Sequence, residues 1–196
     1  MTENRGQGKG IGDEKKLTYD DYASLDDGLR YELVDGRLEL MSPGPASLHQ
    51  LVSSEMQRTM FDSCHSSYIV LSAPIDLILS EYEVRQPDLL MIHRSRMDII
   101  RKRGIVGAPD LVVEILSPTT LRRDKRDKLK TYARFGITEY WIVEPTLGTL
   151  EQHVLDGERY ELYNTYQGEE PVGSPHVSCI SFTMKAIMDH IPEIKD

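Results

Sequence analysis

The stretch that decides the fold is Leu111-Val112-Val113-Glu114-Ile115-Leu116. All of its residues except Glu114 are aliphatic, and such a run is typical of a central strand that is buried on both faces. A carboxylate that is buried without a partner destabilises a fold by several kcal/mol, so Glu114 requires a cation, a hydrogen-bond network or a water-filled cleft. The stretch therefore predicts a central strand that carries a functional acid.

Hairpins and helices alternate on both sides of this strand. Residues 31–40 read as a β-hairpin, because Asp35-Gly36 is a strong two-residue turn. Apolar residues recur at helical spacing over residues 46–62, which predicts an amphipathic helix. The other expected elements are helices over residues 18–25, 122–135 and 183–190, and strands over residues 67–72, 75–79, 84–92, 139–143, 149–155 and 160–163.

This order predicts one α/β (α+β) domain over residues 17–196, with a mixed central β-sheet flanked by helices and additional β-hairpins. Residues 1–16 are polar and glycine-rich, which is typical of a disordered tail. Pro87 lies inside the strand expected over residues 84–92. Because proline lacks the N–H donor of a ladder, this strand is expected at an edge or with a local distortion.

The composition excludes several classes of protein. A net charge of −9 argues against a polybasic nucleic-acid binder. No stretch approaches the ~20 apolar residues of a membrane span, and no secretory signal is visible. Cys64 and Cys179 lie far apart and form no CxxC pair, so we expect free thiols in a reducing, cytoplasmic compartment.

The charge is unevenly distributed along the chain. Residues 101–134 carry a net charge of +6, which leaves −15 for the rest. One interpretation is a surface that attracts a polyanion such as DNA. The other is a solvated helix face with ion pairs such as Asp124 to Lys128, four residues apart.

A second acid, Asp88, follows Pro87 on a strand expected near that of Glu114. Two carboxylates that converge from neighbouring strands form a hard oxygen site suited to Mg²⁺ or Mn²⁺. Such a metal polarises a phosphoryl oxygen and lowers the pKa of a bound water. The basic helix after Glu114 offers a lysine that could orient this water or stabilise developing charge.

Asp88 and Glu114, with a lysine after them, have the spacing of the PD-(D/E)XK nucleases. A longer pattern resembles a large bacterial family of restriction-endonuclease-like proteins in that superfamily, formerly a domain of unknown function. The resemblance covers about residues 17–190. It rests on the segments 31–36, 41–45 with His49 after them, 86–88, 108–118 and 139–143, and on Asp124 with Lys128 and Tyr132.

The resemblance implies a restriction-endonuclease-like fold and a divalent-metal site. Asp88 matches the metal-binding aspartate, and Glu114 matches the acid of the (D/E)XK motif. Glu32 matches an N-terminal acid that can join the metal shell. His49 matches a position at the start of the second helix, where it would act as a general base or contact a phosphate.

The third position of the (D/E)XK motif is Leu116 here instead of lysine. The resemblance suggests that the lysine has moved to the following helix, at Lys128. At ~100° per residue, Lys128 lies at the edge of the buried stripe of that helix, and Lys125 lies nearer its centre but in the first turn. Lys128 is therefore the preferred residue and Lys125 the second candidate, while Tyr132 is expected in the core and Asp124 as a helix cap.

Three functions fit these residues. The leading hypothesis is a Mg²⁺- or Mn²⁺-dependent DNA endonuclease that acts as a homodimer, since cleavage of a duplex usually needs two sites. The alternative is a nuclease-fold protein without cleavage activity that acts in DNA binding or protein assembly, which the replacement of the motif lysine by Leu116 favours. The third is a binding module for a small phosphorylated ligand.

Overall fold

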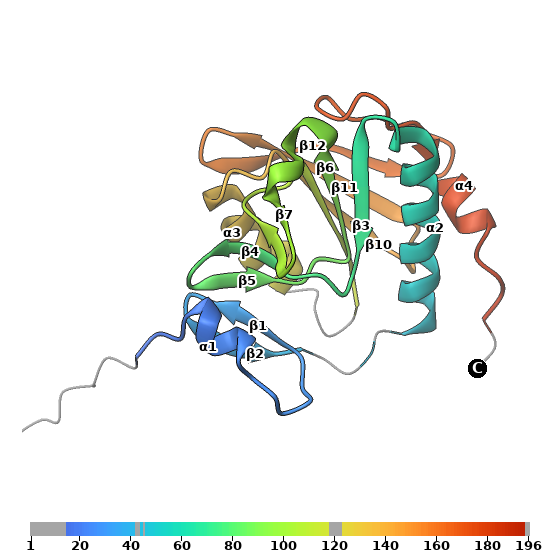
Figure 1. The fold of residues 1–196 in the computed structure, drawn as a ribbon. Coiled ribbons are helices and arrows are strands. Elements are labelled where there is room, and N and C mark those ends of the chain that lie inside the picture. The colour runs from blue at the N-terminus through green and yellow to red at the C-terminus, as the bar shows by residue number, and fades with distance from the viewer. Residues whose placement is uncertain (1–14, 42–43, 45, 118–122, 195–196) are drawn as a thin grey trace, which may run out of the picture.

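Two mixed six-stranded sheets form most of this computed structural model, which describes residues 15–41, 44, 46–117 and 123–194 (Figure 1). Sheet A has the strand order β2-β1-β5-β4-β8-β7, and sheet B has the order β12-β11-β10-β9-β6-β3. The elements of the first half are α1 (Tyr19–Ala23), β1 (Tyr31–Val34), β2 (Arg37–Leu40), α2 (Ser47–Cys64), β3 (Tyr68–Ser72), β4 (Leu77–Ser80), β5 (Glu83–Arg85), β6 (Leu89–His93) and the 3₁₀ helix η1 (Arg94–Ile99). Those of the second half are β7 (Ile100–Arg101), β8 (Gly104–Val106), β9 (Leu111–Ile115), the π-helical segment η2 (Arg123–Lys128), α3 (Leu129–Arg134), β10 (Glu139–Glu144), β11 (Thr149–Asp156), β12 (Arg159–Gln167), β13 (Pro171–Val172), β14 (Phe182–Thr183) and α4 (Met184–Asp189).

Strand β9 lies inside sheet B, between β6 and β10, and every residue in it is buried. Side chains alternate between the two faces of a strand. Val113 packs with the apolar residues of α2 and α4, whereas Val112 packs with Tyr132 of α3 and with Leu77 of sheet A. Figure 1 shows α2 and α4 together on one side of sheet B and α3 on the other. The predicted central strand is confirmed, and Glu114 shares the face of Val112.

Sheet A begins with the predicted hairpin. Asp35 and Gly36 have φ angles of 49° and 79°, the left-handed conformation that a two-residue hairpin turn requires. Thr18 and Asp21 form a capping box at the start of α1, which packs on Leu33 and Val84 on one face of the sheet. Glu32 and Arg85, the neighbours of these residues along β1 and β5, therefore face the opposite side, toward α3.

The strand expected over residues 84–92 is in fact two strands in different sheets. β5 belongs to sheet A and β6 to sheet B, and residues 86–88 cross between them. Pro87 provides the physical reason, because it cannot donate to a ladder and so ends the pairing of β5. The crossing places Asp88 where the two sheets meet.

The expectation of free cysteines is wrong. Cys64, the last residue of α2, and Cys179, in the loop before β14, form a disulfide across Cα atoms 5.2 Å apart. A separation of 115 residues in sequence hid this contact, which only the packing of the C-terminal segment against α2 creates. The cytoplasmic location therefore stays a prediction without that support.

Two further expectations concern the ends and the membrane. Residues 1–14 of the tail expected to be disordered lie outside the described residues, whereas Lys16 is described and its ammonium lies 2.6 Å from the carboxylate of Asp35. Among the described helices, none is long and apolar enough to cross a membrane.

Candidate active site

Asp88 and Glu114 come together on neighbouring strands of sheet B. β6 and β9 pair antiparallel, with Leu89 opposite Val113 and Leu90 opposite Val112. One further step along this register brings Asp88 opposite Glu114. Directly opposed residues of an antiparallel pair point to the same face, with Cβ atoms about 5 Å apart. The two carboxylates therefore converge on the face that α3 covers.

The fold holds one oxygen of each carboxylate. Asp88 Oδ2 accepts a hydrogen bond from the backbone N–H of Ile115 at 2.7 Å. Glu114 Oε1 accepts hydrogen bonds from Lys128 Nζ at 2.6 Å and from the hydroxyl of Tyr132 at 2.8 Å. The other two oxygens, Asp88 Oδ1 and Glu114 Oε2, accept no hydrogen bond from a described residue.

Lys128 lies at the centre of a cluster of acids. Its side chain is 2% exposed, and its Nζ lies 2.6 Å from Glu114, 3.4 Å from Asp124 and 3.6 Å from Glu32. Asp124, which was expected to cap the helix, is instead a buried partner of this lysine. One ammonium therefore bridges carboxylates from β1, β9 and η2.

The second candidate lysine points elsewhere. Lys125 is partly exposed, and its Nζ pairs with Glu151 at 2.6 Å. Residues 123–128 form a π-helical segment, in which hydrogen bonds run from i to i+5. The angle of 100° per residue does not apply there, which is why the helical projection placed Lys125 too near the buried stripe.

Glu32 is fully buried behind Lys128. Its Oε1 accepts a hydrogen bond from the backbone N–H of Gln86 at 3.0 Å, and its Oε2 lies 3.4 Å from Nη1 of Arg85. Arg85 is itself buried and also donates to Glu83 at 2.8 Å and to Thr131 at 3.2 Å. Direct metal binding by Glu32 stays a prediction, since both of its oxygens already accept hydrogen bonds or ion pairs.

His49 lies in the first turn of α2, and its Nε2 is 3.2 Å from Asp88 Oδ2. Burial lowers the pKa of His49, but the hydrogen bond and the charge of Asp88 outweigh this effect and raise the pKa overall. The structure thus joins His49 to Asp88, and Glu32 to Glu114 through Lys128.

Burial also controls the charge of Glu114. It raises the pKa of Glu114 to about 8; Lys128 opposes the rise, and Asp124, Asp88 and Glu32 add to it. Concentrated negative charge raises the free energy of ionised carboxylates, and a nearby cation lowers it. The cluster therefore favours a further cation near Glu114.

The donor set fits a hard divalent cation. Carboxylate oxygens are the ligands that Mg²⁺ and Mn²⁺ prefer, and Mg²⁺ is often held by one or two carboxylates together with substrate phosphates. Asp88 Oδ1 and Glu114 Oε2 are the two oxygens available for this. Within the described ranges, no group of three or more His, Cys, Asp or Glu side chains forms a ready-made metal site.

Two residues of the cluster were not assigned a functional part by the sequence. Tyr132 is buried as expected, but its hydroxyl also binds Glu114. Arg85 was not singled out, although an arginine within an expected strand, like an acid, requires a buried partner. Reading Arg85 together with Glu32 is the signal that would have found this ion pair.

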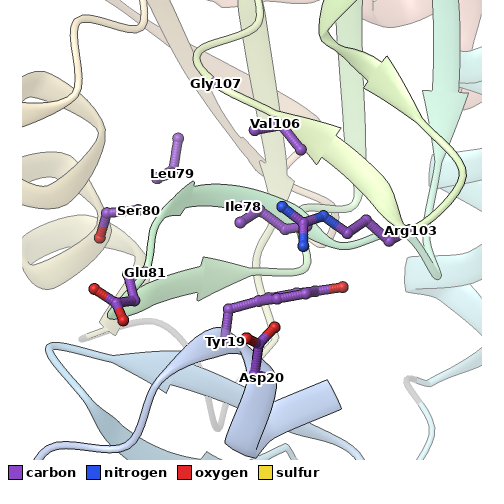
Figure 2. Close-up of a pocket in the computed structure, with 9 residues that line it drawn as sticks. All are labelled: Tyr19, Asp20, Ile78, Leu79, Ser80, Glu81, Arg103, Val106 and Gly107. Carbon is purple, nitrogen blue, oxygen red and sulfur yellow. The ribbon is translucent and has the colours of Figure 1, made fainter.

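A cavity of about 380 Å³ lies away from this cluster, on the α1 side of sheet A (Figure 2). Its lining includes the ring of Tyr19, the aliphatic side chains of Ile78 and Val106, and Arg103. None of the predicted site residues lines it. The acids thus form a compact site of their own, separate from this cavity.

Comparisons with known proteins agree with this architecture. A family model named Uma2, described as "Putative restriction endonuclease", matches residues 18–185. The chain is similar in structure to a protein described as a "putative nuclease belonging to DUF820" from Anabaena variabilis ATCC 29413, whose crystal structure was determined at 1.96 Å resolution. The TM-score is 0.71 over 88% of this chain and 98% of that chain, and the sequence identity of 18% supports the fold alone. No curated protein matches the chain. The chain belongs to the Uma2 family of restriction-endonuclease-like proteins.

Proposed function

We propose that this chain is a Mg²⁺- or Mn²⁺-dependent endonuclease that hydrolyses phosphodiester bonds of DNA. The observation that carries the proposal is the convergence of Asp88 and Glu114 from neighbouring strands, each with one oxygen that no described residue binds, beside the ammonium of Lys128. Membership of a nuclease-like family supports the same reaction class.

In this proposal Asp88 and Glu114 hold the metal. When bound, the metal would polarise a phosphoryl oxygen and lower the pKa of a water molecule. Lys128 orients the attacking water or neutralises the charge that develops on the pentavalent phosphate. Glu32 assists by keeping Lys128 in place, and it would join the metal shell only by releasing Gln86 or Arg85.

His49 was expected to act as a general base or to contact a phosphate. Its raised pKa favours the second role, because the imidazolium form donates from both ring nitrogens and carries a positive charge. Its place in the first turn of α2, an 18-residue helix, supports this, since helix N-termini attract anions.

Cleavage of both strands of a duplex requires two sites, and we therefore propose a homodimer. A monomer with one site would nick supercoiled plasmid and release open circles before any linear product. A dimer that cuts both strands in one encounter would release linear DNA directly, and light scattering would give the mass of two chains.

One observation favours the alternative of a nuclease-fold protein without cleavage activity. Lys128 already compensates the carboxylates of Glu114, Asp124 and Glu32 without a metal. Such a protein would bind DNA, or assemble with other proteins, through the same fold.

The test is incubation of the purified protein with supercoiled plasmid and with single-stranded DNA, in Mg²⁺, in Mn²⁺ and in EDTA. We expect cleavage with either metal and none in EDTA. DNA binding without cleavage, unaffected by EDTA, would support the alternative.

The hydroxyl of Tyr132 offers a finer prediction. Tyr132→Phe removes a hydrogen bond to Glu114, and the loss of a group that orients a ligand weakens metal binding by about 10-fold or more. Tyr140→Phe is the matched control, because its equally buried ring packs on Tyr132 while its hydroxyl donates to the backbone oxygen of Asp124 at 3.1 Å. Calorimetric titration with Mn²⁺ would measure both, and equal losses of affinity would contradict the assignment.

A further inference from the structure

The turn between β7 and β8 carries three consecutive cations, Arg101, Lys102 and Arg103, and all three are exposed. Neither Arg101 nor Lys102 forms an ion pair with a residue in the described ranges. The chain as a whole has a net charge of −9, so its average field repels a polyanion and only a local cluster of cations can attract one. We infer that this turn, the basic turn 101–103, contacts the phosphate backbone of the DNA substrate, an inference that rests on the proposed function.

The basic turn is held firmly against the rest of sheet A. Gly104 has a φ of 141°, and a Cβ on it would lie 2.5 Å from the backbone oxygen of Asp76, so the close approach requires glycine. The same oxygen accepts a hydrogen bond from the N–H of Ile105 at 2.8 Å. The guanidinium of Arg103 lies 4.8 Å from the centre of the Tyr19 ring. A turn fixed in this way presents Arg101 and Lys102 with little loss of backbone entropy on binding.

A short chain of contacts connects the basic turn to the candidate active site. Asp76, which touches Gly104, accepts a hydrogen bond from Gln86 Nε2 at 2.9 Å. The backbone N–H of Gln86 donates to Glu32 at 3.0 Å, and Asp88 follows two residues later. The turn and the carboxylates are therefore at the same end of the molecule.

A fourth cation lies at the same residue. Arg30 Nη2 donates to Gln86 Oε1 at 2.5 Å, so Gln86 lies between an arginine from the segment before β1 and the aspartate that the basic turn packs on. β7 forms the edge of sheet A, which leaves the turn accessible from outside (Figure 1). A DNA strand that reaches Asp88 along this edge would pass Arg30 and the turn.

The chemistry of these side chains fits phosphate more than base recognition. Arginine and lysine at an exposed turn neutralise phosphates and release counterions, which gives sequence-independent binding that weakens with salt. The segment 101–103 offers no Asn or Gln side chain to read base edges. The turn is therefore expected to add affinity without adding sequence preference.

The experiment measures DNA binding separately from cleavage, in a Glu114→Gln background and with a short fluorescent duplex. The test variant carries Arg101→Gln and Lys102→Gln, while Arg103 is left intact because it packs on Tyr19. The control carries Arg58→Gln and Arg159→Gln, two exposed arginines on α2 and β12, and has the same change in net charge.

We expect the Kd of the test variant to rise about 10-fold, and the slope of log K against log salt to fall by about 1 for each phosphate that the variant no longer neutralises. The control should change Kd less than about 2-fold, since exposed charges beyond a Debye length are screened. Equal changes in both variants would overturn this inference and leave the proposed function intact. Absence of DNA binding in the parent protein would overturn both, and thermal melting of each variant would show that it is folded.

Discussion

Glu114→Gln should lower the rate of DNA cleavage by roughly 10³-fold or more while the protein stays folded. A bound metal contributes several kcal/mol of charge stabilisation to phosphoryl chemistry, and each 1.36 kcal/mol corresponds to about tenfold in rate. A glutamine at this position can still accept the hydrogen bonds from Lys128 and Tyr132 through its amide oxygen. It removes the carboxylate, and with it the charge that would hold the cation.

The same reasoning applies to Asp88→Asn, since its amide oxygen can still accept from the N–H of Ile115. Asp110→Asn is the matched control. Asp110 directly precedes the N-terminal end of β9 and binds Arg96 at 2.7 Å and the backbone N–H of His93 at 2.7 Å, so it supports the fold away from Glu114. We expect Asp110→Asn to keep its cleavage activity.

Plasmid cleavage, Mn²⁺ titration by calorimetry and thermal melting would be measured for all three variants. Cleavage that persists in Asp88→Asn or Glu114→Gln would sink the assignment of the metal site. A melting temperature for Glu114→Gln at or above that of the parent would exclude unfolding as the cause of lost activity.

Lys128→Met should reduce the free energy of unfolding by about 3–5 kcal/mol, the usual result of removing one partner from a buried ion pair. The ammonium lies among Glu114, Asp124 and Glu32, which are all buried. Methionine fills a similar volume but leaves these carboxylates without their shared cation. We also expect the variant to lose cleavage activity.

Lys125→Met is the matched control, three residues earlier in the same basic segment. Lys125 pairs with Glu151 at the surface, and exposed pairs contribute about 1 kcal/mol or less. Urea denaturation would measure both variants. Similar decreases in stability would contradict the central place of Lys128 and restore Lys125 as the second candidate.

The effect of Lys128→Met should also depend on pH. Burial raises the pKa of Glu114 to about 8, and Lys128 opposes that rise, so the variant should have a still higher pKa at Glu114. A folded-state pKa above the unfolded value means that the folded protein binds the proton more tightly, and this stability is lost as pH rises through the folded pKa. The deficit against the parent protein should therefore be larger at about pH 9 than at about pH 6.

Local patterns in the sequence predicted most of the regular elements. The Asp35-Gly36 turn, the capping box at Thr18 and the helical spacing over residues 46–62 all act over a few neighbouring residues. Such signals do not depend on the rest of the chain. The strand expected over residues 84–92 was wrong in its continuity, because which sheet each half joins depends on partners that are distant in sequence.

The candidate site was predicted in part for the same reason. Glu114 is visible because an acid inside an aliphatic strand is costly, and the resemblance supplied Asp88 and Glu32. Lys128 required a choice that the ideal helix angle could not make, since the π-helical segment changes the side that each residue faces. The buried arginine, Arg85, became part of the site only when β1, β5 and α3 packed together.

The sequence by itself determined the central strand, its acid, the family pattern and the uneven charge, because these follow from local periodicity and from residue types in order. The tertiary structure alone decided that one ammonium serves three carboxylates, that residues 86–88 pass between two sheets, and that Cys64 meets Cys179. Each of these contacts joins segments far apart in the chain. Their free energy depends on burial and on distances between side chains, and neither quantity exists before the sheets and helices pack.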